Sequence, residues 1–179
     1  MRRLPACGRP LLLALAGEFR PVDTETTDTH LDELALPLFG LASGELRSAA
    51  SVLAGVLDGY DPDRTSVASL WLDVALEACA GHPLVLAAIA AEVGRRAGLA
   101  VQVLSSPAGW YAGLADGERL WLVDTTLDGR RADPWSLRRH CAHELAFAAL
   151  LGLAERYERA GDHQRAGRAA ELRSRLPLR

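Results

Sequence analysis

The chain has 179 residues, a formal net charge of −3 at pH 7, 49% hydrophobic residues and 24% charged residues. This composition is typical of a single globular domain, and it excludes extensive disorder and nucleic-acid binding driven by bulk positive charge. All twenty basic residues are arginine, which excludes chemistry that needs a lysine. We interpret the lack of lysine and asparagine as the codon bias of a GC-rich genome, such as that of an actinobacterium.

The three cysteines are scattered and form no Cys-x-x-Cys motif: Cys7, Cys79 and Cys141. This usage fits a reducing compartment and offers no zinc ribbon. The apolar run from Leu11 to Ala16 follows two arginines but is too short for a signal peptide, and no window approaches the roughly 20 apolar residues of a membrane span. We therefore expect a cytoplasmic protein without a membrane partner.

The first 27 residues are interpreted as an N-terminal extension, and helices follow it. Apolar residues recur at helical spacing from Leu31 to Leu38, with Thr27 or Asp28 as N-cap and an end near Leu36 before Pro37. A second helix is predicted from Ser43 to about Leu57.

A turn at Gly59 to Asp63 separates these helices from a third one. Thr65 or Ser66 would cap that helix, which carries an apolar stripe to Ala78 and is closed by Gly81. Pro83 then fits the first turn of a fourth helix, predicted to be the most buried because its residues from Leu84 to Ala97 are nearly all apolar.

The period changes to that of strands after Gly98. Three short strands separated by turns are predicted: Leu99 to Ser106, Gly109 to Gly113 and Arg119 to Asp124. Asp133-Pro134 is then expected to open a long helix to about Ala160, and Gly161-Asp162 to separate it from a last helix ending near Arg175. The predicted fold class is α+β: a helical N-terminal half, a small antiparallel sheet and a C-terminal helical hairpin.

Two motifs occur in a distinctive order. Gly81-His82-Pro83 precedes an apolar helix and a strand, and Leu122-Val123-Asp124-Thr125-Thr126 follows them. This order resembles that of the transglutaminase-like superfamily. The resemblance implies a papain-like core with a cysteine at the start of the helix, a histidine on one strand and an aspartate on the next.

A bacterial branch whose helix begins Gly-x-Pro is more similar still, and it ends in a tetratricopeptide-like helical pair. Ala160-Gly161-Asp162 between two apolar helices matches that tail. The resemblance covers about residues 28 to 177. It implies an extension at 1–27, a transglutaminase-like core at 28–132 and a tetratricopeptide-like tail at 133–179.

The resemblance places Pro83 at the cysteine position and Gly109 or Trp110 at the histidine position, so only Asp124 remains of the three. A thiol nucleophile needs a positioned base, and the family's acyl transfer is therefore not carried over. Asp124 is expected to be structural.

A relocated site remains an alternative, built from Cys79, His82, Asp124 and Tyr111. The helix start beside His82 would favour a thiolate. The competing interpretation is that Cys79 is a buried small residue and His82 an N-cap or turn residue.

Two further clusters carry candidate ligands. His140, Cys141 and His143 suggest a metal, but no further ligand is placed by the sequence, so a polar helix face is favoured and no metal or cofactor is expected. Four arginines beside the Asp133-Pro134 helix start suggest a weak anion site or a solvated face: Arg130, Arg131, Arg138 and Arg139.

The expected ligand cleft is lined by His82, Pro83, Trp110, Tyr111 and Asp124, although Trp110, Tyr111 and Trp121 also suit a core. The leading hypothesis is a non-catalytic protein that holds a peptide, a protein or a small ligand there. The alternative is a hydrolase or acyl-transfer enzyme of a biosynthetic pathway. The tail either extends the core or pairs across a homodimer.

Overall fold

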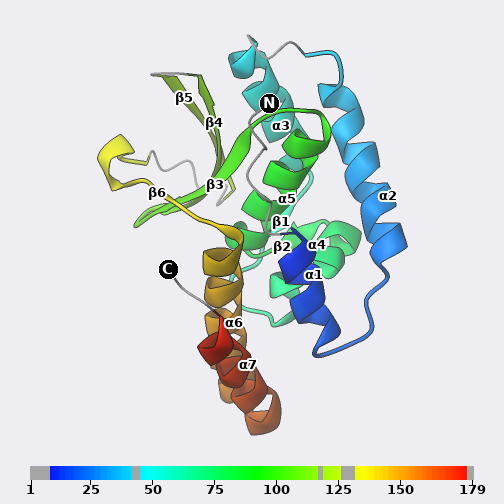
Figure 1. Ribbon diagram of the computed structural model, residues 1–179, viewed down its shortest axis with the longest axis vertical. Helices are drawn as coiled ribbons and strands as arrows, with labels where there is room; N and C mark the ends of the chain where they lie inside the picture. Colours follow the sequence, from blue (N-terminus) through cyan, green and yellow to red (C-terminus); the bar gives the residue numbers. More distant parts are fainter. Residues whose placement is uncertain (1–8, 42–44, 117–118, 126–131, 177–179) are drawn as a thin grey trace.

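A computed structural model describes residues 9–41, 45–116, 119–125 and 132–176. It is an α+β structure in which helices pack against one face of a small sheet (Figure 1). The longer helices are α1 (Arg9–Gly17), α2 (Thr24–Ala35), α3 (Leu46–Leu57), α4 (Leu72–Ala78), α5 (Pro83–Arg96), α6 (Ala142–Arg159) and α7 (His163–Arg175). The predicted fold class is confirmed.

The sheet is antiparallel and has the strand order β5-β4-β3-β6. Its strands are β3 (Val101–Ser106), β4 (Gly109–Asp116), β5 (Arg119–Asp124) and the short β6 (Arg138–Arg139). The first three are those that the sequence predicts. A separate parallel bridge pairs β1 (Asp61–Pro62) with β2 (Ala80–Gly81), and it holds the end of α4 beside the start of α5.

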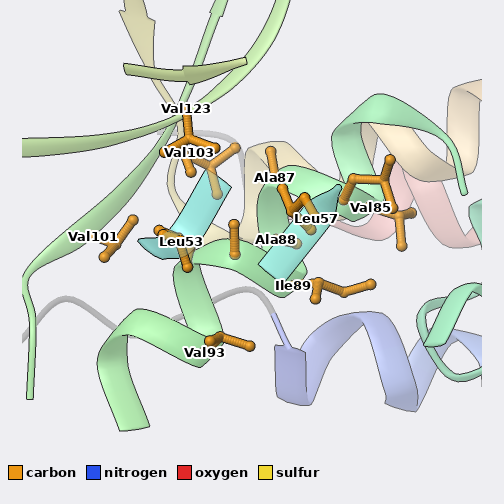
Figure 2. Close-up of a cluster of buried hydrophobic side chains, with 14 of the residues drawn as sticks. Leu53, Leu57, Val85, Ala87, Ala88, Ile89, Val93, Val101, Val103 and Val123 are labelled. Carbon is orange, nitrogen blue, oxygen red and sulfur yellow. The ribbon is translucent and has the colours of Figure 1, made fainter. Parts of the chain in front are cut away.

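Helix α5 forms the centre of the core, as its composition predicts. Every residue from Pro83 to Gly94 is buried. Val101, Val103 and Val123 of the sheet point towards α5, and Leu53 and Leu57 of α3 lie in the same cluster (Figure 2). The one acidic residue in this stretch, Glu92, accepts hydrogen bonds from Arg95 and Arg96, so its charge is paired as burial requires.

The N-terminal region is more helical than the sequence indicates. The apolar run from Leu11 to Ala16 lies in α1, whose buried side chains contact both parts of the core. Helix α2 begins before the expected caps Thr27 and Asp28, because the carboxylate of Asp23 accepts from the backbone of Glu25 and Thr26 at 3.1 and 3.0 Å. It ends at Ala35, as Pro37 predicts. The proposed domain limits at residues 27 and 132 remain predictions.

The third predicted helix is shorter than expected. Thr65 and Ser66 donate their backbone N–H groups to Asp63 instead of capping an α-helix. A 3₁₀ turn, η2 (Ala68–Leu70), comes first, and α4 begins only at Leu72.

The prediction that a long helix begins at Asp133-Pro134 is wrong, because that helix begins later in the chain. Asp133 caps only a 3₁₀ turn, η3 (Pro134–Ser136), and Leu137 is extended with φ −72° and ψ 125°. The chain then pairs with β3 as β6, and α6 begins at Ala142 behind a capping box formed by Cys141 and Glu144. Strand pairing therefore overrides the local helix signal.

Helices α6 and α7 form the expected hairpin, which extends away from the sheet (Figure 1). Phe19, just after α1, lies between Trp71 and Tyr157, with ring centroids 5.4 and 5.9 Å away. Buried Arg156 of α6 donates to the carbonyl oxygen of Arg64 at 2.6 Å and to that of Gly152 at 3.1 Å. The stacking of Phe19 on Tyr157 and the bond from Arg156 to Arg64 O join the hairpin to the core. The tetratricopeptide-like character of the hairpin remains a prediction.

Candidate functional site

The start of α5 holds two of the predicted site residues. His82 is the N-cap of α5. Its ring Nδ1 accepts a hydrogen bond from the backbone N–H of Leu84 at 3.2 Å, and the backbone N–H of His82 donates to Ser69 O at 2.8 Å. Pro83 occupies the first turn, where its missing N–H costs nothing. The N-cap interpretation of His82 is thus confirmed, and the helix start presents no nucleophile at position 83.

The half-buried ring of His82 is held neutral at physiological pH. Burial, followed by the positive charges of Arg156 and Arg64, lowers the pKa of His82 to about 4, against a smaller opposing effect of Asp63. A neutral imidazole whose Nδ1 already accepts a backbone hydrogen bond keeps only Nε2 for a ligand.

Cys79 lies on the surface, which corrects the expectation of a buried cysteine. It ends α4 in the left-handed conformation, with φ 47° and ψ 38°, where the chain turns away from the helix. Its Sγ lies 3.9 Å from Leu76 O, while His82 Nδ1 is engaged in capping α5. The hydrogen bonds that these two side chains make in the described part of the chain therefore go to different backbone groups.

Thr125 joins two of the predicted site residues, Pro83 and Trp110, through their backbone. Its hydroxyl oxygen is completely buried and lies 2.9 Å from Pro83 O and 2.8 Å from Trp110 O. One hydroxyl hydrogen thus serves both carbonyl groups. The start of α5, the beginning of β4 and the end of β5 meet at this point.

The predicted cleft residues do not all share one face of the sheet. Trp110 is paired with Ser105 in the register, and its side chain packs with the core on the α5 side. Tyr111 and Asp124 are paired with each other. Tyr111 directly follows Trp110, and Asp124 directly follows Val123, which also faces α5. Because strand side chains alternate, both point to the opposite face. There Tyr111 is 2% exposed and Asp124 is half-buried with a fully covered Oδ2.

Sequence reasoning missed a polar contact beside Trp110. Ser105 Oγ lies 2.6 Å from His140 Nε2, and the Trp110 ring packs on the His140 ring with centroids 4.8 Å apart. Burial is the main cause that lowers the pKa of His140. Alternation after Val101 and Val103 could have placed Ser105 on this face, but only the β3–β6 pairing brings His140 to it.

The metal interpretation of His140, Cys141 and His143 is not supported by these contacts. His140 binds Ser105 through its ring, and the Cys141 side chain caps α6. Within the described ranges, no group of three or more potential metal ligands occurs.

The predicted anion cluster is only partly described. Arg138 is exposed and pairs with Glu144, and Arg139 is exposed beside it. Arg130 and Arg131 lie outside the described residues. A cavity of about 640 Å³ lies elsewhere, between α1 and the start of α2, with Arg9, Arg20 and Asp28 in its lining. None of the described helices combines the length and apolarity that a bilayer crossing requires.

Comparison with protein-family models matches residues 14–164 to the transglutaminase-like superfamily. No curated protein and no solved structure matches this chain significantly.

Proposed function

The chain belongs to the transglutaminase-like superfamily, and from this premise we propose that it is a non-catalytic member that binds a peptide, a protein or a small ligand in a degenerate cleft. The observation that carries the proposal is the Thr125 hydroxyl between Pro83 O and Trp110 O. It ties the backbone of Pro83 to that of Trp110, and neither of these side chains supplies a nucleophile or a base.

The ligand-binding part of the proposal concerns the α5-facing end of the sheet. Trp110 and His140 are half-buried there, and Ser105 adds a hydroxyl group. His82 contributes its Nε2 from the helix start. An apolar ring edged by a few polar groups suits binding by contact and hydrogen bonding. Tyr111 and Asp124 would support β4 and β5 from the opposite face.

The hydrolase or acyl-transfer alternative rests on one observation, the exposure of Cys79 three residues before His82. A reactive thiol there would need His82 as its base. Because Nδ1 of His82 accepts the capping bond, the ring proton lies on Nε2, so His82 could take a proton from the thiol only by releasing the N-cap of α5.

An alkylation experiment separates the two proposals. The protein is treated with an iodoacetamide probe, and labelling of Cys79 and of Cys141, which is also exposed, is followed by mass spectrometry. We expect similar rates at both thiols, unchanged by His82→Asn. Rapid labelling of Cys79 that His82→Asn suppresses would establish the relocated site and refute the non-catalytic proposal.

Binding is tested by capture from the native host with immobilised wild-type protein and with Trp110→Ala. Phe39→Ala is the matched control, since Phe39 is an exposed aromatic residue on the 3₁₀ turn after α2. A captured component that Trp110→Ala loses and Phe39→Ala retains supports the cleft. Equal capture by all three folded proteins contradicts it.

A further inference from the structure

Trp135 is the most exposed large apolar side chain in the described part of the molecule. It lies in η3 and is 95% exposed, whereas the other described tryptophans, Trp71, Trp110 and Trp121, contribute to the core. Tryptophan is buried on average and is enriched among the residues that dominate binding energy at interfaces. An unburied tryptophan on a short turn is therefore a candidate anchor for a partner.

Among the residues that the structure describes, the strand that follows Trp135 has a pairing partner on one side only. The strand order β5-β4-β3-β6 places β6 at the border of the sheet. Arg138 is paired with Ser105, and the next residue but one, His140, donates its N–H to Val103 O at 3.0 Å. Since backbone groups of an antiparallel strand alternate in direction, the N–H and C=O of Arg139 point away from β3. Such a pair can accept another extended chain.

Charge at this edge favours an acidic partner. Arg138 and Arg139 are both exposed, and an ion pair joins Arg138 to Glu144. Trp135 and Arg138 are three residues apart, so their Cα atoms are separated by at most about 11 Å. A single short segment can contact the ring, the guanidinium groups and the backbone of Arg139 together.

We propose that the edge of β6, with Trp135 and Arg139, docks an extended acidic segment of a partner protein. The segment adds to the sheet through the N–H and C=O of Arg139. Its carboxylates face the arginines, and an apolar side chain packs on Trp135. The proposed surface is the outer edge of β6, whereas the proposed cleft uses the α5-facing side chains of Ser105, Trp110 and His140. The variants below leave those three side chains in place, so they test the edge separately from the proposed function.

The test uses a fluorescein-labelled eight-residue peptide of alternating glutamate and valine, with the lysine–valine peptide as its charge-reversed counterpart. Binding to the full chain is measured by fluorescence anisotropy. We expect saturable binding of the acidic peptide, weakened by salt, and at least tenfold weaker binding of the basic one. Equal binding of both peptides, or binding of neither, would overturn the proposal.

Two variants locate the contact. Trp135→Ala removes the exposed ring without opening the core, and we expect about a tenfold loss of affinity. Arg139→Pro removes the outward N–H, a change that edge strands tolerate because that group makes no ladder bond; we expect binding to be lost. Unchanged affinity in Trp135→Ala would refute the anchor whatever the fate of the proline variant.

Matched controls exclude non-specific effects. Phe39→Ala removes another exposed aromatic ring, and Arg47→Glu reverses an exposed arginine on α3, to be compared with Arg139→Glu. We expect both controls to bind the acidic peptide as the wild type does. Phosphatidylglycerol vesicles are the remaining arm: a blue shift of tryptophan fluorescence that Trp135→Ala abolishes, without peptide binding, would assign the surface to a membrane and refute the proposal.

Discussion

The hydroxyl group of Thr125 lies 2.9 Å from the carbonyl oxygen of Pro83, although 42 residues separate the two along the chain. Pro83 begins the most buried helix, and Thr125 directly follows β5. The bond therefore links the start of the helix to the end of the sheet.

Thr125→Val keeps the shape of the side chain and removes the hydroxyl hydrogen, which leaves Pro83 O and Trp110 O without this donor. We expect the free energy of unfolding to fall by about 1–3 kcal/mol in urea titrations. Thr125→Ser retains the hydroxyl group and should lose less. A valine variant as stable as the wild type would contradict the role of this bond.

The stability of the protein should fall as the pH drops from about 6.5 to about 4. In this window the unfolded chain protonates His82, whereas the folded protein does not, because its pKa is lowered to about 4. The loss attributable to His82 is about 3 kcal/mol at most.

Urea unfolding of wild type and His82→Asn at several pH values measures this loss. Asparagine still caps the helix but does not titrate, and carboxylate protonation is common to both proteins. We expect the wild type to lose more stability than the variant between pH 7 and pH 4. Parallel curves would show that His82 does not contribute.

Gly94 allows α5 to approach β3 closely. A Cβ at this position would lie 2.2 Å from Val101 Cγ2. We expect Gly94→Ala to destabilise the protein by about 1–3 kcal/mol, and Val101→Ala in the same chain to recover part of the loss.

Gly55→Ala is the matched control for this substitution. Gly55 is exposed in α3, and a Cβ added there would have no other atom within 4 Å, so alanine should stabilise the helix by about 0.5–1 kcal/mol. Calorimetry on both variants gives the comparison, and a similar effect at the two positions would argue against close packing at Gly94.

Arg156→Met tests how the C-terminal hairpin is held. Methionine fills much of the buried volume but cannot donate to Arg64 O or Gly152 O. We expect a loss of about 2–3 kcal/mol, since hydrogen bonds to charged groups are among the stronger ones. Arg159→Met, on the exposed side of the same helix, should change stability by less than about 0.5 kcal/mol.

Local signals in the sequence predict a large part of the fold. Helix α5 is predictable because a proline stands at its first turn, Gly98 follows its end and its residues are almost all apolar. The start of α6 is not, because Asp133-Pro134 carries an equally good local signal. The pairing of Arg138 and Arg139 with β3 prevails there, and no local rule contains that partner.

The candidate site shows the same division. The cap by His82 follows from three consecutive residues and is predictable from them. The contacts of Thr125 with Pro83 and of Ser105 with His140 join residues 42 and 35 positions apart. They depend on strand register and helix placement, which the spacing of residues in one sequence does not define.

The position of Phe19 between Trp71 and Tyr157 also bears on how the protein is made. Phe19 is synthesised before Tyr157, which lies 138 residues later along the chain. Leu15 and Ala16 of α1, which lie in the same cluster as the hairpin side chains, therefore gain these contacts only after the intervening residues have been made. This aromatic cluster therefore forms only after two segments far apart in the sequence have both been synthesised.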